Sequence, residues 1–205
     1  MSRRIGLVRH GAHDELGRVL SGRATDVALN AAGRDEAAVL GRALSKGCGQ
    51  DAGAIGAIHA SPQRRTRETA GILGETLGVV PQVDPALDEV DFGRWAGQGF
   101  AALDSDPDWQ EWNRRRASAP SPGGETMQAA TLRAARRLDT LAAEAGGGAA
   151  LLCVSHCDII RGVIAHYLRL SLDHILRFSI DPGRVSWLDV DGQGGAQVLS
   201  VNARN

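Results

Sequence analysis

The first residues that could do chemistry are an arginine and a histidine side by side. Arg9-His10-Gly11 follows the apolar run Ile5–Val8, and the glycine allows the backbone to turn there. Arginine offers planar, bidentate donors that suit a phosphate dianion. A neutral imidazole is a nucleophile near pH 7 when an acceptor holds its other ring nitrogen protonated. The tripeptide alone fits equally well a structural histidine beside a surface arginine.

Three later segments carry side chains that could complete a phosphoryl-transfer site. Arg65 falls in the first turn of a helix that is predicted to begin at Ser61-Pro62, and helix N-termini favour anions. Leu87–Gly93 holds three carboxylates, one of which could protonate a leaving alkoxide. His156 could stabilise charge on the phosphoryl group. Taken singly, these segments also fit a solvated helix face, a turn and a core histidine.

The elements that must position these residues alternate between strand and helix. Such alternation predicts a parallel sheet covered by helices on both faces, with ligands at the carboxyl ends of the strands. Asn30 and Ser61 are the predicted N-caps of the first two helices. The predicted strands are Ile5–Val8, Ala54–Ala60, Val79–Val83 and Ala149–Val154, the helices are Ala31–Leu44, Pro62–Leu77, Glu125–Ala145 (ended by Gly146-Gly147-Gly148) and Asp158–Leu170, and Val185–Val190 pairs with Gln197–Val201 as a hairpin.

The chain length suits one domain, residues 1–205, with an insertion. The hydrophobic share of 43% is enough to build a core. Residues 91–124 differ from the rest because they hold three of the four tryptophans, and we expect them to form a lid. Within this segment, Arg114-Arg115-Arg116 is either a solvated helix face or a contact to a second anionic group of the substrate.

Charge and cysteine content narrow the class of partner. The net charge is −1, from 23 basic and 24 acidic residues, so no global field favours nucleic acid or a membrane. The three cysteines have no metal-ligand spacing, and the first residues contain no signal-peptide apolar region, which together favour the cytoplasm. Cys157 stands at a predicted helix start, where a thiolate is favoured. The expected partner is a small phosphorylated substrate, bound by a monomer or homodimer.

These segments together resemble the histidine phosphatase superfamily, the phosphoglycerate mutase-like proteins. The resemblance runs in the family's order from Leu7 to about Leu170, and six loose patterns in register are specific. The matching segments are Leu7-Val8-Arg9-His10-Gly11, Ser21-Gly22-x-x-x-Asp26-x-x-Leu29-Asn30-x-x-Gly33, Ser61-x-x-x-Arg65-x-x-x-Thr69-Ala70, Leu87-x-Glu89-x-Asp91-Phe92-Gly93-x-Trp95-x-Gly97, Pro122-Gly123-Gly124-Glu125-Thr126 and Val154-Ser155-His156.

The resemblance implies a role for each matching residue. His10 is the nucleophile, and Arg9, Arg65 and His156 form the phosphate pocket with it. Glu89 is the general acid for the leaving group and then the base that activates water. The family's fold is a three-layer αβα sandwich with a mostly parallel central sheet, and its hydrolysis uses no metal and no dissociable cofactor.

The sequence departs from the family next to the nucleophile. Members often carry Gly-Glu-Thr or Gly-Glu-Ser there, with an Asn a few residues on, whereas this chain has Gly11-Ala12-His13 and Leu16. Two polar contacts to phosphate or substrate are therefore in doubt, and His13 and Asp14 are candidates to replace them. His13 and Arg23 are the predicted additional substrate-binding residues.

Three other functions are weighed against phosphomonoester hydrolysis through a phosphohistidine. A mutase would transfer the phosphoryl group rather than hydrolyse it, but family mutases usually carry longer insertions around the site. A non-catalytic phosphate-binding module would not need Glu89. A metalloenzyme could use His10, His13 and Asp14, with His59 nearby in sequence, yet their spacing matches no standard zinc pattern.

Overall fold

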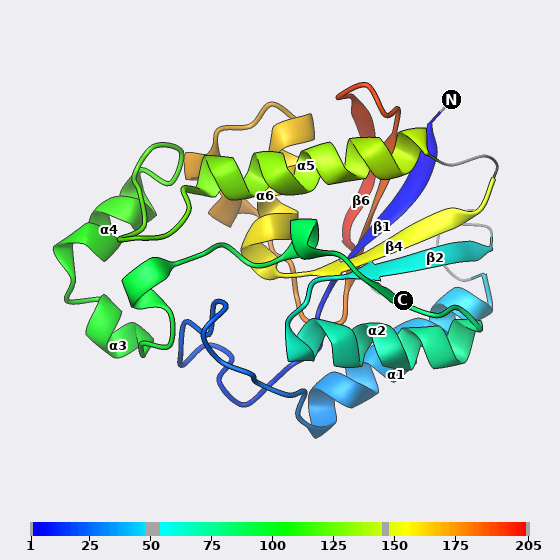
Figure 1. Cartoon of the computed structure of the whole chain (residues 1–205), viewed down its shortest axis with the longest axis horizontal. Coiled ribbons are helices and arrows are strands. Elements are labelled where there is room, and N and C mark those ends of the chain that lie inside the picture. The colour runs from blue at the N-terminus through cyan, green and yellow to red at the C-terminus, as the bar shows by residue number, and fades with distance from the viewer. Residues whose placement is uncertain (1, 48–53, 145–147, 204–205) are drawn as a thin grey trace.

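The computed structural model describes residues 2–47, 54–144 and 148–203 (Figure 1). Cys48, and Ala145, Gly146 and Gly147 at the predicted end of the longest helix, lie outside these residues. Within the described residues, short 3-10 helices span Pro85–Leu87, Gly93–Trp95 and Leu172–Arg177. The strands and α-helices are β1 (Arg3–Arg9), α1 (Ala31–Ser45), β2 (Ile55–Ala60), α2 (Arg64–Leu77), β3 (Gln82–Val83), α3 (Phe100–Leu103), α4 (Pro107–Arg114), α5 (Met127–Ala143), β4 (Ala150–Ser155), α6 (Cys157–Tyr167), β5 (Val185–Val190) and β6 (Ala196–Ala203).

The strands form one sheet in the order β3-β2-β4-β1-β5-β6. β1, β2, β3 and β4 run parallel, whereas β5 pairs antiparallel with both β1 and β6. The predicted mostly parallel sheet and the predicted C-terminal hairpin are both confirmed. β3 has two residues, because only Gln82 and Val83 of the predicted strand Val79–Val83 pair with β2.

Helices cover both faces of this sheet, so the predicted three-layer αβα sandwich is confirmed. In Figure 1 α5 and α6 lie on one face, and α1 and α2 lie on the other. Leu151 and Cys153 of β4 pack into the core beneath α5 and α6, while Leu152 and Val154 pack with α1 and α2. Because successive side chains of a strand point to opposite faces, a strand covered on both sides is apolar at every position.

The starts of three helices test the predicted caps. Asn30 caps α1 as predicted, since its side chain accepts from Gly33 N at 2.9 Å. The predicted cap Ser61 is wrong: α2 begins at Arg64, and the Ser61 hydroxyl instead contacts Asp88 and His156. α5 begins two residues later than predicted, at Met127.

Residues 91–124 form a small helical unit around aromatic side chains. Trp109 stacks on Trp112 with ring centroids 5.4 Å apart, and Trp95 meets Trp109 edge to face at 5.3 Å. Phe92 packs edge to face on Trp112 at 5.6 Å. Offset and edge-to-face aromatic contacts add to ordinary apolar burial, and this cluster is continuous with the core beneath α5 and α6.

Backbone contacts bring the two ends of this segment together. Gly93 has a φ of +54°, and a Cβ there would overlap the carbonyl oxygen of Pro122. Arg94 N donates to Pro122 O at 3.0 Å, and Glu125 N donates to Asp91 O at 2.8 Å. The chain therefore leaves and rejoins the body of the protein at one point, next to the carboxyl end of the sheet.

The topology places two histidines at neighbouring strand ends. β1 and β4 are parallel partners, with Arg9 paired to Ser155 in the ladder. His10 and His156 follow these residues, so their rings emerge at the same edge of the sheet, 5.4 Å apart between centroids. Among the described residues, no helix is long and apolar enough to cross a membrane.

Candidate active site

His10 is held in the tautomer that a nucleophile needs. Its Nδ1 lies 2.8 Å from the carbonyl oxygen of Gly11. A carbonyl oxygen can only accept, so Nδ1 carries the proton and Nε2 keeps its lone pair. Burial and the nearby guanidinium groups of Arg65 and Arg9 lower the pKa of His10 well below its usual value. The ring is therefore neutral near pH 7.

A tight backbone contact fixes the loop that carries this histidine. Gly11 lies against Gly33 at the start of α1, and a Cβ on Gly11 would overlap the carbonyl oxygen of Gly33. Gly11 N also donates to Thr69 Oγ1 of α2 at 3.1 Å. The Gly11-to-Gly33 spacing that the sequence shows is thus a packing requirement, because a side chain at either glycine would push the loop away.

Arg9 and Arg65 lie beside His10, and each has at least one N–H group without a hydrogen-bond partner among the described residues. Arg9 donates from Nη1 to Ile180 O at 2.6 Å, and Arg65 donates from Nη2 to Gly22 O at 2.8 Å. Nε of Arg9, and Nε and Nη1 of Arg65, are buried without a hydrogen-bond partner among the described residues. A buried unpaired donor costs about 1–3 kcal/mol. The oxygens of a bound phosphate would satisfy these donors.

His156 completes this cluster from the start of α6. The side chain is fully buried, and its Nδ1 lies 3.1 Å from Arg65 Nη2. Its Nε2 lies 2.8 Å from the hydroxyl of Ser61. Burial, followed by the charge of Arg65, lowers the pKa of His156 well below its usual value.

Glu89 stands beside this cluster with properties that suit an acid. Its Oε2 lies 3.7 Å from His156 Nδ1, and its Oε1 accepts from Val90 N at 2.9 Å. Burial, followed by the charge of Asp158, raises the pKa of Glu89 to about 7, against an opposing effect of Arg65. Such a carboxyl group exists in both protonation states at neutral pH, which general acid–base catalysis requires.

The five predicted site residues surround or adjoin one cavity of about 440 Å³. Arg9, His10, Arg65 and Glu89 line it, and His156 contacts Arg65 and Glu89 from behind. The rest of the wall is partly apolar and comes from the loop after β1, from residues 91–124 and from the first turns of α6. Further lining residues are His13, Leu16, Gly17, Val19, Leu20, Ser21, Gly22, Phe92, Phe100, Trp109, Arg116, Cys157, Asp158 and Arg161.

Of the two predicted additional substrate contacts, only His13 lines the cavity. Its ring centroid lies 5.2 Å from that of His10, and its buried Nδ1 has no hydrogen-bond partner among the described residues. Burial, followed by the charge of Arg65, lowers the pKa of His13 to about 4, so the ring is neutral. Asp14, the other candidate replacement, instead accepts from Asn30 Nδ2 at 3.1 Å.

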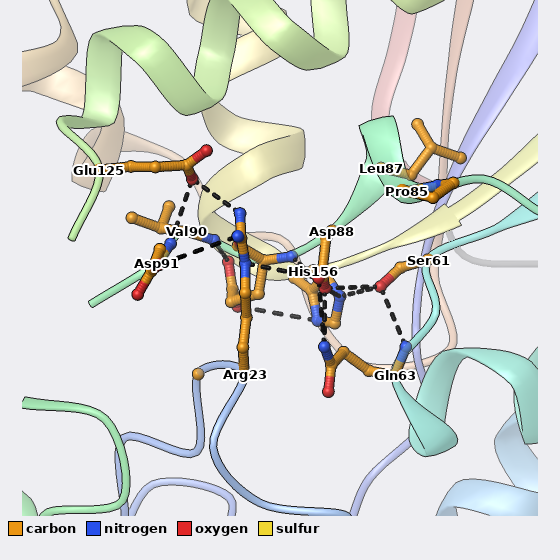
Figure 2. A network of polar contacts seen from close by, with 12 residues as sticks. Arg23, Ser61, Gln63, Pro85, Leu87, Asp88, Val90, Asp91, Glu125 and His156 are labelled. Carbon is orange, nitrogen blue, oxygen red and sulfur yellow. Dashed lines mark hydrogen bonds and ion pairs between the residues drawn. The ribbon is translucent and has the colours of Figure 1, made fainter. Parts of the chain in front are cut away.

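Arg23 is not among the residues that line the cavity, and its predicted contact with substrate stays a prediction. Its Nε donates to the carbonyl oxygen of Glu89 at 2.7 Å, and its Nη2 donates to Glu125 at 2.8 Å (Figure 2). The side chain therefore braces the loop that carries Glu89. No signal in the sequence distinguishes this brace from a substrate contact, because Glu89 and Glu125 are 66 and 102 residues away.

The three consecutive arginines divide between two environments. Arg114 and Arg115 are exposed and pair with Glu111 at 2.9 and 3.4 Å. Arg116 is buried, lies 4.2 Å above the Trp112 ring, and lines the cavity. The solvated face is thus correct for two of the three, and only Arg116 can meet a ligand.

Asp158 and Arg161 of α6 line the cavity but were not predicted from the sequence, and the expected thiolate at Cys157 is wrong. Asp158 lies 3.4 Å from Arg116 and 3.6 Å from Arg161, so it links the two arginines across the wall. Their i, i+3 spacing in the helix that follows His156 could have indicated them. Cys157 was expected as a thiolate, but burial raises the pKa of its thiol to about 11. Desolvation outweighs the helix N-terminus there.

Comparison with known proteins decides the family. The sequence model of the histidine phosphatase superfamily (branch 1) matches residues 5–203 of this chain. This chain belongs to the histidine phosphatase superfamily. The family predicted from the sequence is therefore confirmed over nearly the whole length.

Individual proteins and solved structures similar to this chain are 27 to 32% identical to it over the aligned residues. The bifunctional protein Rv2228c of Mycobacterium tuberculosis is 32% identical over 155 residues, which cover 73% of this chain but only 41% of that relative. The glucosyl-3-phosphoglycerate phosphatase of the same species is 28% identical over 200 residues, covering 93% of this chain and 86% of the relative. A solved structure described as mycobacterial hydrolase 1 superposes with a TM-score of 0.85 at 27% identity, covering 100% of both chains.

Proposed function

We propose that this protein hydrolyses small phosphate monoesters through a phosphohistidine on His10. The observation that carries the proposal is the neutral, Nδ1-protonated imidazole of His10 facing a cavity whose arginines have unpaired buried donors. Phosphatases among its relatives support the reaction class. In this proposal Arg9, Arg65 and His156 bind the phosphoryl oxygens, and Glu89 moves the proton.

In the first step the phosphoryl group passes from the substrate to the protein. Nε2 of His10 attacks phosphorus, and the bond from phosphorus to the ester oxygen breaks. The protonated carboxyl of Glu89 gives its proton to that oxygen, which leaves as an alcohol. Because positive donors meet the charge that spreads over the phosphoryl oxygens, the residues present can stabilise the transition state.

In the second step water releases phosphate. The Glu89 carboxylate now takes a proton from a water molecule, whose oxygen attacks phosphorus while the phosphorus–nitrogen bond breaks. His10 returns to its neutral form and Glu89 to its acid form, so the cycle closes. A pKa near 7 for Glu89 serves both steps, since neither protonation state is strongly disfavoured at neutral pH.

The lining of the cavity indicates that the leaving group meets both apolar side chains and one buried arginine. Leu16, Leu20, Phe100 and Trp109 line it with apolar surface, and Arg116 is buried in the same wall. We assign residues 91–124 the role of a lid over the leaving group, because Phe92, Phe100, Trp109 and Arg116 of this segment line the cavity. His13 would contact the substrate from the opposite loop.

The proposed function also includes a cell compartment and an oligomeric state for this protein. Cys153 and Cys157 are free thiols, which supports a reducing compartment, and we propose the cytoplasm. A net charge of −1 favours neither nucleic acid nor a membrane surface as partner. We propose a monomer or homodimer, which sedimentation at several concentrations would decide.

The test is single-turnover trapping. The protein is mixed with a ³²P-labelled monoester, quenched in alkali, and compared with His10→Ala. We expect an acid-labile, alkali-stable phosphoprotein in the wild type alone, together with release of phosphate to water and full activity in excess EDTA. Transfer of the label to a second alcohol in place of water would favour a mutase. Absence of turnover with bound phosphate would favour a binding module, and loss of activity in EDTA would favour a metalloenzyme.

A further inference from the structure

Asp88, the residue before Glu89, is buried at the centre of a polar network and does not itself line the cavity. Its Oδ1 accepts three hydrogen bonds, from Glu89 N at 2.8 Å, Gln63 Nε2 at 2.9 Å and Ser61 Oγ at 3.1 Å (Figure 2). Arg23 Nε lies 3.4 Å from its other oxygen. Such a set of donors holds the carboxylate in one place.

The hydroxyl of Ser61 connects this carboxylate to His156. A hydroxyl has one proton, and here it donates that proton to Asp88, since the carboxylate has none to give. The 2.8 Å contact between Ser61 Oγ and His156 Nε2 must then be a donation by the ring. The chain of hydrogen bonds therefore places a proton on Nε2 of His156.

The other ring nitrogen of His156 faces the phosphate side. Nδ1 lies 3.1 Å from Arg65 Nη2 and 3.7 Å from Glu89 Oε2. Arg65 can only donate, so Nδ1 is an acceptor in the structure, and the positive groups of Arg65, Arg9 and Arg23 around it oppose a charged ring. A phosphate dianion bound beside Nδ1 would add negative charge there. It would raise the pKa of the ring and favour a second proton, on Nδ1.

We propose that Ser61 and Asp88 are positioning residues that hold His156 by Nε2, so that Nδ1 takes up a proton and donates to the phosphoryl group. The proton comes from solvent when the dianion binds. Asp88, through the hydroxyl of Ser61 and at 3.9 Å from Nε2, stabilises the resulting imidazolium. This inference rests on the proposed phosphatase function, for which it names how the second histidine is oriented and charged.

The test combines kinetics with the protonation state of His156. Asp88→Asn keeps the shape and an acceptor oxygen but removes the charge, whereas Ser61→Ala breaks the chain. With an aryl phosphate, whose leaving group needs little protonation, we expect kcat to fall about 10- to 100-fold in both, as when the partner of an oriented histidine is removed. Asp35→Asn and Ser45→Ala, both at exposed positions of α1, are the matched controls.

The pH profile separates this role from a merely structural one. In the proposal, the ring of His156 is doubly protonated in the complex with substrate. Loss of the negative charge of Asp88 makes this imidazolium less stable, so it loses its proton at a lower pH. The alkaline limb of kcat is therefore expected to move to lower pH in Asp88→Asn. An unchanged limb would overturn the proposal, even where the rate falls.

Nitrogen-15 NMR of histidine-labelled protein gives a readout without turnover. We expect Nε2 of His156 to be protonated without phosphate, and both ring nitrogens to be protonated with vanadate bound, with a His156→Gln spectrum for assignment. A Nδ1-protonated ring in the wild type would overturn the inference, even where phosphatase activity is intact. If Ser61→Ala does not fold, Asp88→Asn and this spectrum decide. A wild type that hydrolyses no monoester overturns the proposed function itself.

Discussion

The guanidinium of Arg23 donates to the backbone carbonyl of Glu89 at 2.7 Å. The same group lies 2.8 Å from Glu125, 3.4 Å from Asp88 and 4.0 Å from Asp91. Three carboxylates this close would repel one another without a cation between them. Arg23 thus stabilises the loop that presents the proposed acid to the cavity.

Replacing Arg23 with Gln should misplace the acid without altering the nucleophile. We expect the kcat for alkyl phosphates to fall about tenfold, with a much smaller change for aryl phosphates, since one misplaced proton donor is a fraction of the 10²- to 10⁴-fold that such a group contributes. Arg67→Gln, an exposed arginine of α2, is the control. A rise in KM alone, for both kinds of ester, would instead assign Arg23 to substrate binding.

Glu89→Gln should slow substrates according to their leaving group. Alkyl phosphates should lose about 10²- to 10⁴-fold in kcat/KM, and aryl phosphates far less. In the wild type, kcat/KM for alkyl esters should decline as the pH rises through about 7, where Glu89 loses its proton, and this decline should vanish in the variant. Equal losses for both esters would show that Glu89 is not the acid for the leaving group. Glu75→Gln, exposed on α2, is the matched control.

Glu89→Gln should also raise the free energy of unfolding at alkaline pH. The pKa of Glu89 is raised from 4.5 to about 7, so between these values the folded protein binds more protons than the unfolded chain. The free energy of unfolding of the wild type therefore falls as the pH rises through this window. Well above pH 7 the Gln variant should be more stable by about 3 kcal/mol, with little difference at pH 4.5. Urea titrations at both pH values measure this, and a variant less stable at pH 8 would contradict it.

Arg116→Gln should affect only substrates with a second negative charge. Arg116 is buried in the cavity wall, so an anionic leaving group would gain a charge-assisted contact worth about 1.5–3 kcal/mol. We expect about a tenfold or larger rise in KM for carboxylate-bearing phosphate esters and no change for an uncharged aryl ester. The neighbouring Arg114→Gln is the control, because that side chain is exposed and paired with Glu111. A substrate panel that shows no difference between charged and uncharged leaving groups would remove Arg116 from recognition.

The sequence by itself determined the framework and the kinds of group at the strand ends. Apolar runs such as Ile5–Val8 must be buried, and their breaks mark where parallel strands deliver side chains to one edge. His10 and His156 could therefore be placed near each other without coordinates. Their resemblance to family motifs then added a role for each, including Arg65 and Glu89.

Tertiary structure alone decided which polar groups meet. The proline after Ser61 predicts a helix cap at Ser61, because proline suits a first turn, but the Ser61 hydroxyl instead contacts His156, 95 residues away. Arg23 and Arg116 likewise took partners that local patterns could not indicate. A side-chain hydrogen bond depends on a few tenths of an ångström between distant segments, whereas strand and helix periodicity depends only on neighbours along the chain.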